Sequence, residues 1–211
     1  MPVPANEIQL SILVLSIPSR IEKITSLISN LEKQLKDRRS VEILVLTDNR
    51  SQTISEKRNV LLRAARGKFI CFLDDDDCVS NDYIDKLLTA ISENSTVDCI
   101  SFNQFCNIDG EPMTVNFGIG NPHSGLYRDE EGFLTDIKRP PYHMCVWKRR
   151  IAQSEQFNPM LGANGQSYGE DLDWLMRLYP KIQTEHNIED TLHNYIYNSN
   201  TTTSLVPQSS T

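Results

Sequence analysis

The stretch KFICFLDDDD, residues 68–77, places four consecutive aspartates directly after an apolar run. The apolar run does not alternate with polar residues, which predicts a strand covered on both faces, as in a parallel sheet. Four adjacent carboxylates repel one another, so the stability of the fold gives no reason to place them there. Residues 74–77 are therefore expected either to form a solvated turn or to hold a positively charged ligand.

Three other apolar segments predict further strands: IQLSILVLSI (8–17), VEILVL (41–46) and VDCISF (97–102). Between the strands, apolar residues recur at spacings of three and four, which predicts helices over 21–35, around 60–65 and over 83–91. Thr53 and Glu56 form a capping box for the second helix, and Gly67 is expected to end it. Ser80 or Asn81 is expected to cap the third helix. This alternation predicts an α/β fold with a mostly parallel sheet and helices on both faces.

The rest of the chain is less regular. Residues 107–141 are rich in Gly, Pro and Asn, and we expect loops and short antiparallel strands there. A short apolar stretch follows at 143–147, and residues 170–178 predict a helix with an acidic first turn. We find no internal repeat and no linker, so we predict a single domain over residues 1–198, followed by a flexible polar tail over residues 199–211.

The composition excludes several classes of protein. The chain has 211 residues and a net charge of -7, so broad electrostatic attraction to nucleic acid or to anionic membranes is not expected. No apolar run approaches the roughly 20 residues of a membrane-spanning helix, and the N-terminus lacks the features of a signal peptide. The five cysteines have no C-x-x-C spacing, which predicts reduced thiols. We therefore expect a protein of the bacterial, host or viral cytoplasm.

Polar residues follow three of the predicted strands. Ser19 and Arg20 come after the first strand, Asp48 after the second, and the aspartates 74–77 after the third. Because the carboxyl ends of parallel strands lie at one edge of a sheet, these side chains are expected to converge there. The sequence contains neither G-x-G-x-x-G nor G-x-x-x-x-G-K-[ST], which argues against dinucleotide-binding and P-loop folds.

An acidic edge can bind phosphate in another way, through a divalent cation. Mg²⁺ and Mn²⁺ take one or two carboxylates and complete their coordination with water and phosphate oxygens. In an extended segment, Asp74 and Asp76 lie on the same side of the chain and can face a common ion. The alternative is a solvated turn or a set of helix-capping acids. A calcium-binding EF-hand is a poor fit, because Val79 occupies the position where that loop needs glycine.

Four segments resemble family 2 glycosyltransferases of the GT-A fold, in the order typical of that family. They are SILVLSIPSR (11–20), VEILVLTDN (41–49), KRNVLLRAARGKFICFLDDDD (57–77) and YGEDLDW (168–174). The resemblance covers residues 8–100 well and 142–200 more loosely. The chain departs from the family pattern at IPSR, where many members have PTYNR, and at TDN, where many have two acids. It lacks the Q-x-x-R-W motif of processive synthases, which favours transfer of a single sugar.

The resemblance implies roles for individual residues at the donor site. Asp48 matches the acid that contacts the nucleotide base, Asp74 the acid near the ribose, and Asp76 the ligand of the metal ion. His193 is a second candidate metal ligand. Further positions that match the donor site are Pro18, Ser19, Arg20, Arg58 and Asp75.

The resemblance also implies that Asp171 is the general base. A carboxylate within hydrogen-bond reach removes the proton of the acceptor hydroxyl as that hydroxyl attacks the sugar. Glu170 and Asp173 compete for this role, but on a helix Asp171 and Asp173 point about 200° apart, so at most one of them is expected to face the site. The alternative is that all three acids are present because they favour a helix N-terminus.

The function that the resemblance implies is that of an enzyme. It is an inverting glycosyltransferase that uses Mn²⁺ or Mg²⁺ and a nucleotide-sugar donor, with a UDP-sugar favoured, and a glycan or glycolipid hydroxyl as acceptor. A hydroxylated base in viral DNA is an alternative acceptor, although the net charge of -7 argues against it. Two other functions stay open: a nucleotidyltransferase of similar fold, and a non-catalytic module that binds nucleotides or glycans. A nucleotidyltransferase would want a Gly-rich or Lys-bearing loop after the first strand, and SIPSR offers neither.

Three further features have both a functional and a structural interpretation. His143 lines the acceptor side in the family pattern, or is simply a packed or surface residue. Trp174 belongs to the core or stacks on a sugar. The five basic residues between 138 and 150 form a solvated face or meet an anionic acceptor such as a phosphorylated lipid, an acidic glycan or DNA.

Overall fold

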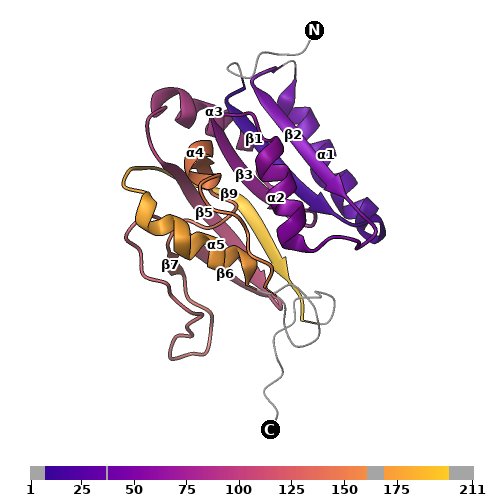
Figure 1. The fold of residues 1–211 in the computed structure, drawn as a ribbon. Coiled ribbons are helices and arrows are strands. Elements are labelled where there is room, and N and C mark those ends of the chain that lie inside the picture. The colour runs from indigo at the N-terminus through magenta and orange to yellow at the C-terminus, as the bar shows by residue number, and fades with distance from the viewer. Residues whose placement is uncertain (1–7, 37, 161–168, 200–211) are drawn as a thin grey trace.

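The computed structural model describes residues 8–36, 38–160 and 169–199, and its strands form one mixed sheet (Figure 1). The main path is β2 (Val41–Thr47), β1 (Leu10–Ser16), β3 (Phe69–Asp74), β8 (Val146–Lys148), β5 (Cys99–Ile108), β6 (Glu111–Phe117) and β7 (Ile137–Arg139). Off this path, β4 (Cys78–Val79) pairs with β9 (Glu185–Tyr197), which also pairs with β5. Apart from Ser199, the predicted flexible tail lies outside the described residues.

The strands that carry the site run in one direction. β1 is parallel to both β2 and β3, and β9 is parallel to β5. The short strand β8 is antiparallel to β3 and to β5, so β3 and β5 also point the same way. The carboxyl ends of these long strands therefore lie at one edge of the sheet, the lower edge in Figure 1.

Helices cover both faces of the sheet, as predicted. They are α1 (Ile21–Leu35), α2 (Ile54–Ala64), α3 (Tyr83–Glu93), α4 (Arg149–Ala152) and α5 (Glu170–Leu178), with 3-10 turns η2 (Pro18–Arg20) and η3 (Tyr179–Lys181). Figure 1 shows α2 and α5 in front of the sheet, whereas α1 and α3 pack against each other on the other face. The Thr53–Glu56 capping box is present at the start of α2. Among the described residues, no helix has the length and apolar character needed to cross a membrane.

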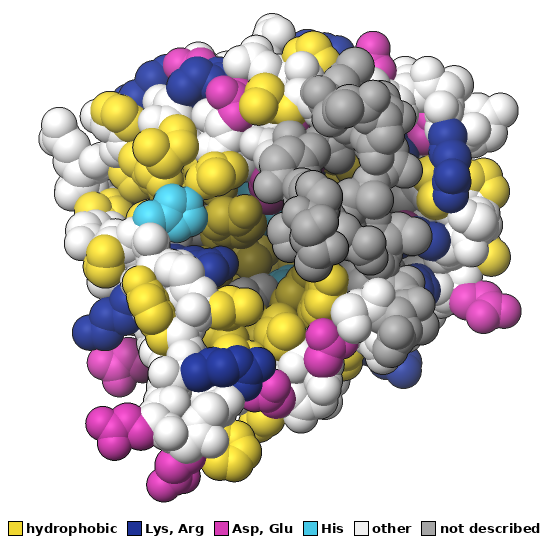
Figure 2. Space-filling model, turned by 90° about the horizontal axis from the view of Figure 1, so that it is seen from below, with side chains coloured by type: hydrophobic (Ala, Val, Ile, Leu, Met, Phe, Trp, Pro, Cys, Tyr) yellow, Lys and Arg dark blue, Asp and Glu magenta, His cyan; other side chains and the backbone are white. Residues whose placement is uncertain are grey.

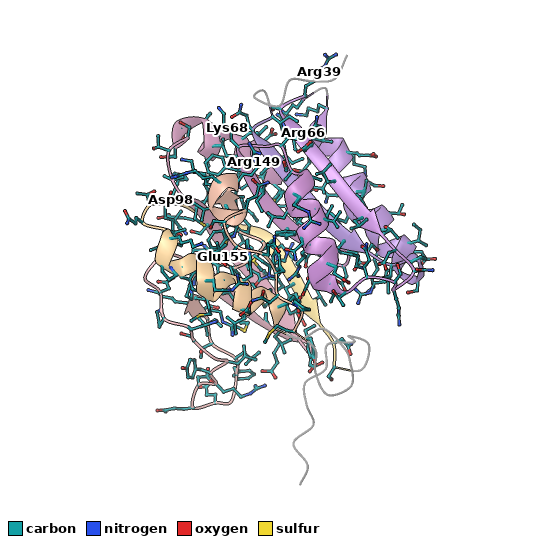
Figure 3. All side chains as sticks on the ribbon, in the orientation of Figure 1. Arg39, Arg66, Lys68, Asp98, Arg149 and Glu155 are labelled. Atoms are coloured by element: carbon teal, nitrogen blue, oxygen red, sulfur yellow. The ribbon has the colours of Figure 1, made fainter. Side chains whose placement is uncertain are left out.

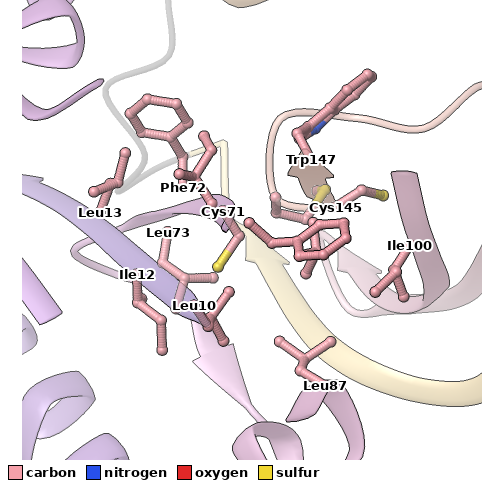
Figure 4. Packing of buried hydrophobic residues seen from close by; sticks show 14 of the residues in the cluster. Leu10, Ile12, Leu13, Cys71, Phe72, Leu73, Leu87, Ile100, Cys145 and Trp147 are labelled. Carbon is pink, nitrogen blue, oxygen red and sulfur yellow. The ribbon is translucent and has the colours of Figure 1, made fainter. Parts of the chain in front are cut away.

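The core lies between the sheet and these helices. Figure 4 shows buried side chains of this core from β1, β3, β5 and β8, among them Leu10, Phe72, Ile100 and Trp147. On the α5 side, the Trp174 ring stacks on Phe157 with 4.6 Å between centroids and meets Phe72 edge-on at 6.1 Å. Trp174 is completely buried, so its interpretation as a core residue is confirmed.

The structure corrects two local predictions. Helix α2 ends at Ala64, so Gly67 does not terminate it. Gly67 instead lies against β1, where an added Cβ would come within 2.6 Å of the Ser11 backbone nitrogen. Helix α3 has Asp82 at its N-cap rather than Ser80 or Asn81.

The irregular region also differs in part from its prediction. β6 is antiparallel to β5, as expected, but β7 is parallel to β6. The 13-residue strand β9 was not predicted, because its sequence EHNIEDTLHNYIY lacks an apolar run.

Candidate active site

Hydrogen bonds connect the end of β1 and the turn that follows it to the aspartates after β3. Ser16 Oγ donates a hydrogen bond of 2.6 Å to Asp75, and Arg20 donates another of 2.6 Å. Asp75 is only 3% exposed, and both of its carboxylate oxygens accept these bonds. The Asp75 carboxylate therefore fixes the first and third strand ends relative to each other. Pro18 and Ser19, which form η2 with Arg20, are placed at the same edge of the sheet.

The four aspartates form a turn, so the expectation that Asp74 and Asp76 alternate along an extended segment is wrong. The Asp77 backbone N–H donates to the Asp74 carbonyl at 3.0 Å, and the Asp74 N–H donates to the Asp77 carboxylate at 2.7 Å. This turn sends the side chains in different directions. Asp74 lies 3.4 Å from Arg58, whereas Asp76 lies 3.1 Å from Lys23 and lines a different pocket.

Strand β9 brings His193 to this turn. Val79 of β4 pairs with His193, and the His193 Nε2 atom lies 3.0 Å from the Asp77 carboxylate. The other ring nitrogen, Nδ1, lies 2.9 Å from the Gln104 side-chain amide on β5. His193 therefore lies next to Asp77 rather than next to Asp76, its predicted companion as a metal ligand.

Asp48 lies just past the end of β2, at the predicted edge, and is held there by its neighbours. Lys57 of α2 forms an ion pair of 2.7 Å with Asp48, and the Gln52 backbone N–H donates at 2.9 Å. The hydrogen bond from Lys57 is the main cause that lowers the pKa of Asp48 to about 2; burial opposes it, and the hydrogen bond from Gln52 adds to the lowering. Lys57 also donates to the Ser16 carbonyl at 3.1 Å, so this buried lysine links the first two strand ends. The sequence analysis missed this lysine.

The three acids at the start of α5 have separate partners. Gly169 precedes them with a φ of 71°, a left-handed conformation that glycine tolerates. Glu170 forms an ion pair of 3.1 Å with buried Arg58, and Asp173 forms one of 2.7 Å with Arg177. Asp171 is the member of this group that lines the pocket described below. The expectation that at most one of Asp171 and Asp173 faces the site is therefore confirmed.

Asp171 lies among groups that favour its ionised form. The His143 Nδ1 atom is 3.4 Å from the Asp171 carboxylate. Burial works against ionisation, but the contact with His143 and the charge of Arg58 lower the pKa of Asp171 well below its usual range. Burial and the neighbouring Asp171 in turn raise the pKa of Tyr142 well above its usual range, so this phenol keeps its proton. The sequence analysis did not single out Tyr142.

These side chains surround one end of a pocket of about 450 Å³. Its acidic end is lined by Asp74, Asp77 and Asp171 together with His143 and His193, and its remaining wall is largely apolar. Figure 2 looks at this edge of the molecule and shows a hollow with hydrophobic side chains on its floor. The volume lies within the range of small-molecule sites. His143, for which both a functional and a structural interpretation were open, lines this pocket next to Asp171.

The acidic end offers a small set of metal ligands. In the part of the chain that is described, no three His, Cys, Asp or Glu side chains are grouped closely enough to enclose an ion. Asp77 and His193 provide one oxygen and one nitrogen, and the His193 Nε2 atom is buried without a hydrogen bond of good geometry. A Mg²⁺ or Mn²⁺ ion that takes one or two protein ligands and otherwise binds water and phosphate fits such a set.

The basic residues between 138 and 150 do not form one patch at this edge. Arg139 lines the pocket, but Lys148 donates to the Thr96 carbonyl and Arg150 lies 3.6 Å from Asp98. Figure 3 shows Arg149 near Arg66 and Lys68, toward the upper edge of the sheet, where the strands begin. Most of this run is therefore remote from the pocket.

Comparisons with known proteins identify relatives of the chain. The family described as Glycosyl transferase family 2 matches residues 24–154. A relative from Haemophilus influenzae, named an uncharacterized glycosyltransferase, is 32% identical over 75 residues, which are 36% of this chain and 26% of that protein. The family match ends before Asp171 and His193, so the roles of these two residues are not covered by it.

Solved structures of S. aureus TarS share the fold. TarS 1–349 has a TM-score of 0.62 at 15% identity, over 90% of this chain and 60% of that chain. Its complex with UDP-GlcNAc has a TM-score of 0.59 at 15% identity, over 91% of this chain and 59% of that chain. The chain thus spans about a quarter of the curated relative and about three fifths of these TarS chains.

Proposed function

The chain belongs to glycosyl transferase family 2, and on this basis we propose that it transfers one sugar from a nucleotide-sugar donor to a hydroxyl of a glycan-type acceptor. A UDP-sugar is favoured as donor, because the TarS structures of the same fold include complexes with UDP and with UDP-GlcNAc. The observation that carries the proposal is the convergence of Asp48, Asp74 and Asp171 on one edge of the sheet, with Asp74 and Asp171 lining one pocket.

In the proposed complex, the nucleotide occupies the ends of β1, β2 and β3. Asp48 contacts the base, Asp74 the ribose, and the η2 turn with Arg20 lies along the diphosphate. Lys57 and Asp75 support this surface, because their buried hydrogen bonds hold the three strand ends together.

A divalent ion held by these residues would stabilise the negative charge on the departing diphosphate. Asp76 is its ligand by family resemblance. Asp77 is a competing ligand, because it lies 3.0 Å from His193 at the acidic end of the pocket. The two acids are distinguishable by substitution, since each one lies in a different environment.

Asp171 accepts the proton of the acceptor hydroxyl in this proposal. The hydroxyl oxygen forms a bond to the anomeric carbon of the sugar while the bond from that carbon to the diphosphate oxygen breaks. The diphosphate leaves with the electron pair, and the anomeric centre is inverted without a covalent enzyme intermediate. His143 and Arg58 favour the ionised form of Asp171, which is the form that a base requires.

The test is a panel of nucleotide sugars with Mn²⁺, read out as thermal stabilisation and as slow hydrolysis of the donor. We expect a UDP-sugar with Mn²⁺ to raise the melting temperature of the protein. If Asp76 is the metal ligand, Asp76→Ala should weaken the affinity for the UDP-sugar, measured from this stabilisation, at least tenfold. Loss of the effect in Asp77→Ala with an intact response in Asp76→Ala would assign the ion to Asp77. If no nucleotide sugar binds and neither substitution changes the protein's response, the proposed function is wrong.

A further inference from the structure

The apolar wall of the active-site pocket is not explained by the proposed donor. Five elements of structure contribute side chains to it, including Ile108 of β5, Met113 and Val115 of β6, Leu126 of the following loop, Ile137 of β7 and Tyr195 of β9. Met113, Val115 and Ile137 are each less than 5% exposed, so packing against their neighbours holds these side chains in place. Leu126 is 53% exposed and also lines the pocket.

The nucleotide side of the site lies elsewhere. The residues proposed to contact the nucleotide at the ends of β1 and β2, Arg20 and Asp48, are not among those that line this pocket. The pocket extends from Asp74 and Asp171 along β5, β6 and β7, away from β1 and β2. An occupant of the apolar wall therefore belongs to the acceptor side of the reaction.

The chemistry of the wall selects its occupant. The aliphatic side chains of Ile108, Met113, Val115 and Ile137 offer no strong hydrogen-bonding group, so a sugar buried against them would lose the hydrogen bonds that its hydroxyls make with water. An alkyl or aryl group has no hydrogen bonds with water to lose in the same place, and removing its apolar surface from water favours binding.

We propose that the acceptor carries an apolar group, which lies against this wall while the attacked hydroxyl lies next to Asp171. The inference rests on the proposed function, since it names the acceptor of that same site. In this proposal, the irregular region between β5 and β8 binds the acceptor: β6, β7 and Leu126 contact its apolar part.

The test measures binding of alkyl β-D-glucosides to the full 211-residue chain by calorimetry, with methyl, butyl, hexyl and octyl glucoside below their micelle-forming concentrations. We expect the affinity to rise by about two- to fourfold per added methylene. Phenyl glucoside is compared with hexyl glucoside, because a preference for the ring would identify an aryl group rather than an alkyl chain.

Two matched variants locate the binding. Leu126→Glu places a charge at the apolar wall. We expect this variant to bind octyl glucoside about tenfold more weakly, and its affinity to depend less on the length of the alkyl chain. Phe133→Glu makes the same change in charge at a 62% exposed residue of the same connecting segment that does not line the pocket. We expect Phe133→Glu to bind octyl glucoside like the unaltered protein.

The inference is overturned if affinity does not depend on chain length, or if Leu126→Glu and Phe133→Glu show the same dependence as the unaltered protein. Thermal stabilisation by a UDP-sugar with Mn²⁺ is measured in parallel. Stabilisation by the donor with a flat alkyl series overturns only the inference about the acceptor. Chain-length-dependent binding without any response to a nucleotide sugar overturns only the proposed function.

Discussion

At the scale of single residues, the site separates acids that look equivalent in the sequence. The carboxylate of Asp75 is buried and accepts hydrogen bonds from Ser16 and Arg20. The side chain of Asp74, by contrast, is 40% exposed and lines the pocket. Asp171 and Asp173 lie two positions apart but face the pocket and Arg177, respectively. Their different surroundings predict different consequences of substitution.

We expect Asp171→Asn to lower the rate of sugar transfer by about 10²- to 10⁴-fold, because an amide cannot accept the proton of the acceptor. Binding of the donor should change little, since the proposed nucleotide site lies at the ends of β1, β2 and β3. The measurement is kcat for transfer together with the Kd of the UDP-sugar. Asp173→Asn is the control, and a loss of kcat as large as that of Asp171→Asn would exclude Asp171 as the specific base.

We expect His143→Ala to make transfer more sensitive to acid. The pKa of Asp171 is depressed in the folded protein, so its carboxylate stays charged as pH falls through the weakly acidic range. Burial raises the pKa of Asp171 and the contact with His143 is the main effect that lowers it, so the pKa of Asp171 should rise when His143 is removed. The acid limb of the kcat profile should therefore move to higher pH. Exposed His123→Ala should leave the profile unchanged, and an unshifted limb in His143→Ala would contradict this account.

At the scale of elements, most strands and helices follow from local sequence patterns. β1, β2, β3 and β5 coincide with apolar runs, and α1 buries Ile24, Leu27 and Leu31 at helical spacing. β9 escaped prediction because its side chains are mostly half-buried or exposed and its stability as a strand comes from pairing with β5. Such pairing joins segments 86 residues apart and leaves no mark in the local sequence.

The same reason limits prediction of the site. The resemblance located the strand ends and the acid pair of α5, but the direction of each aspartate after β3 depends on the turn that precedes β4. The contacts of Arg58 with Glu170 and of Asp77 with His193 cross large sequence separations. No spacing rule within one segment predicts them.

We expect Gly67→Ala to destabilise the protein by about 1–3 kcal/mol, because the added Cβ meets backbone atoms that cannot rotate away. The new atom would lie 2.6 Å from Ser11 N and 2.8 Å from the Leu10 carbonyl carbon. The melting temperature should fall by about 2–4 °C per kcal/mol. Gly125→Ala is the control, since a Cβ there meets nothing within 4 Å. Equal melting temperatures for the two variants would show that β1 adjusts to the extra atom.

At the scale of the whole molecule, charge is distributed in a way that disfavours nucleic acid as acceptor. The net charge is -7, and aspartates surround the acidic end of the pocket. Arg66, Lys68 and Arg149 lie near one another toward the opposite edge of the sheet (Figure 3). A nucleic acid bound to those basic residues would lie away from Asp171.

We therefore expect the protein not to slow the migration of single- or double-stranded DNA in a mobility-shift assay at about 50 mM salt, where electrostatic binding is strong. A DNA-binding protein of similar size serves as the positive control. Binding that weakens steeply as salt is raised would reopen hydroxylated DNA bases as acceptors.

The pairing of β5 with β9 has a consequence for the synthesis of this chain. β9 emerges from the ribosome 86 residues after the part of β5 that it joins, a delay on the order of ten seconds at cellular translation rates. Throughout that interval one side of β5 has unpaired backbone groups, a template for association with another nascent strand. His193 also reaches Asp77 only when β9 has paired with β4. We therefore expect the newly made chain to pass through a stage at which β1, β2 and β3 can pair but the pocket is incomplete, and at which the open side of β5 favours aggregation.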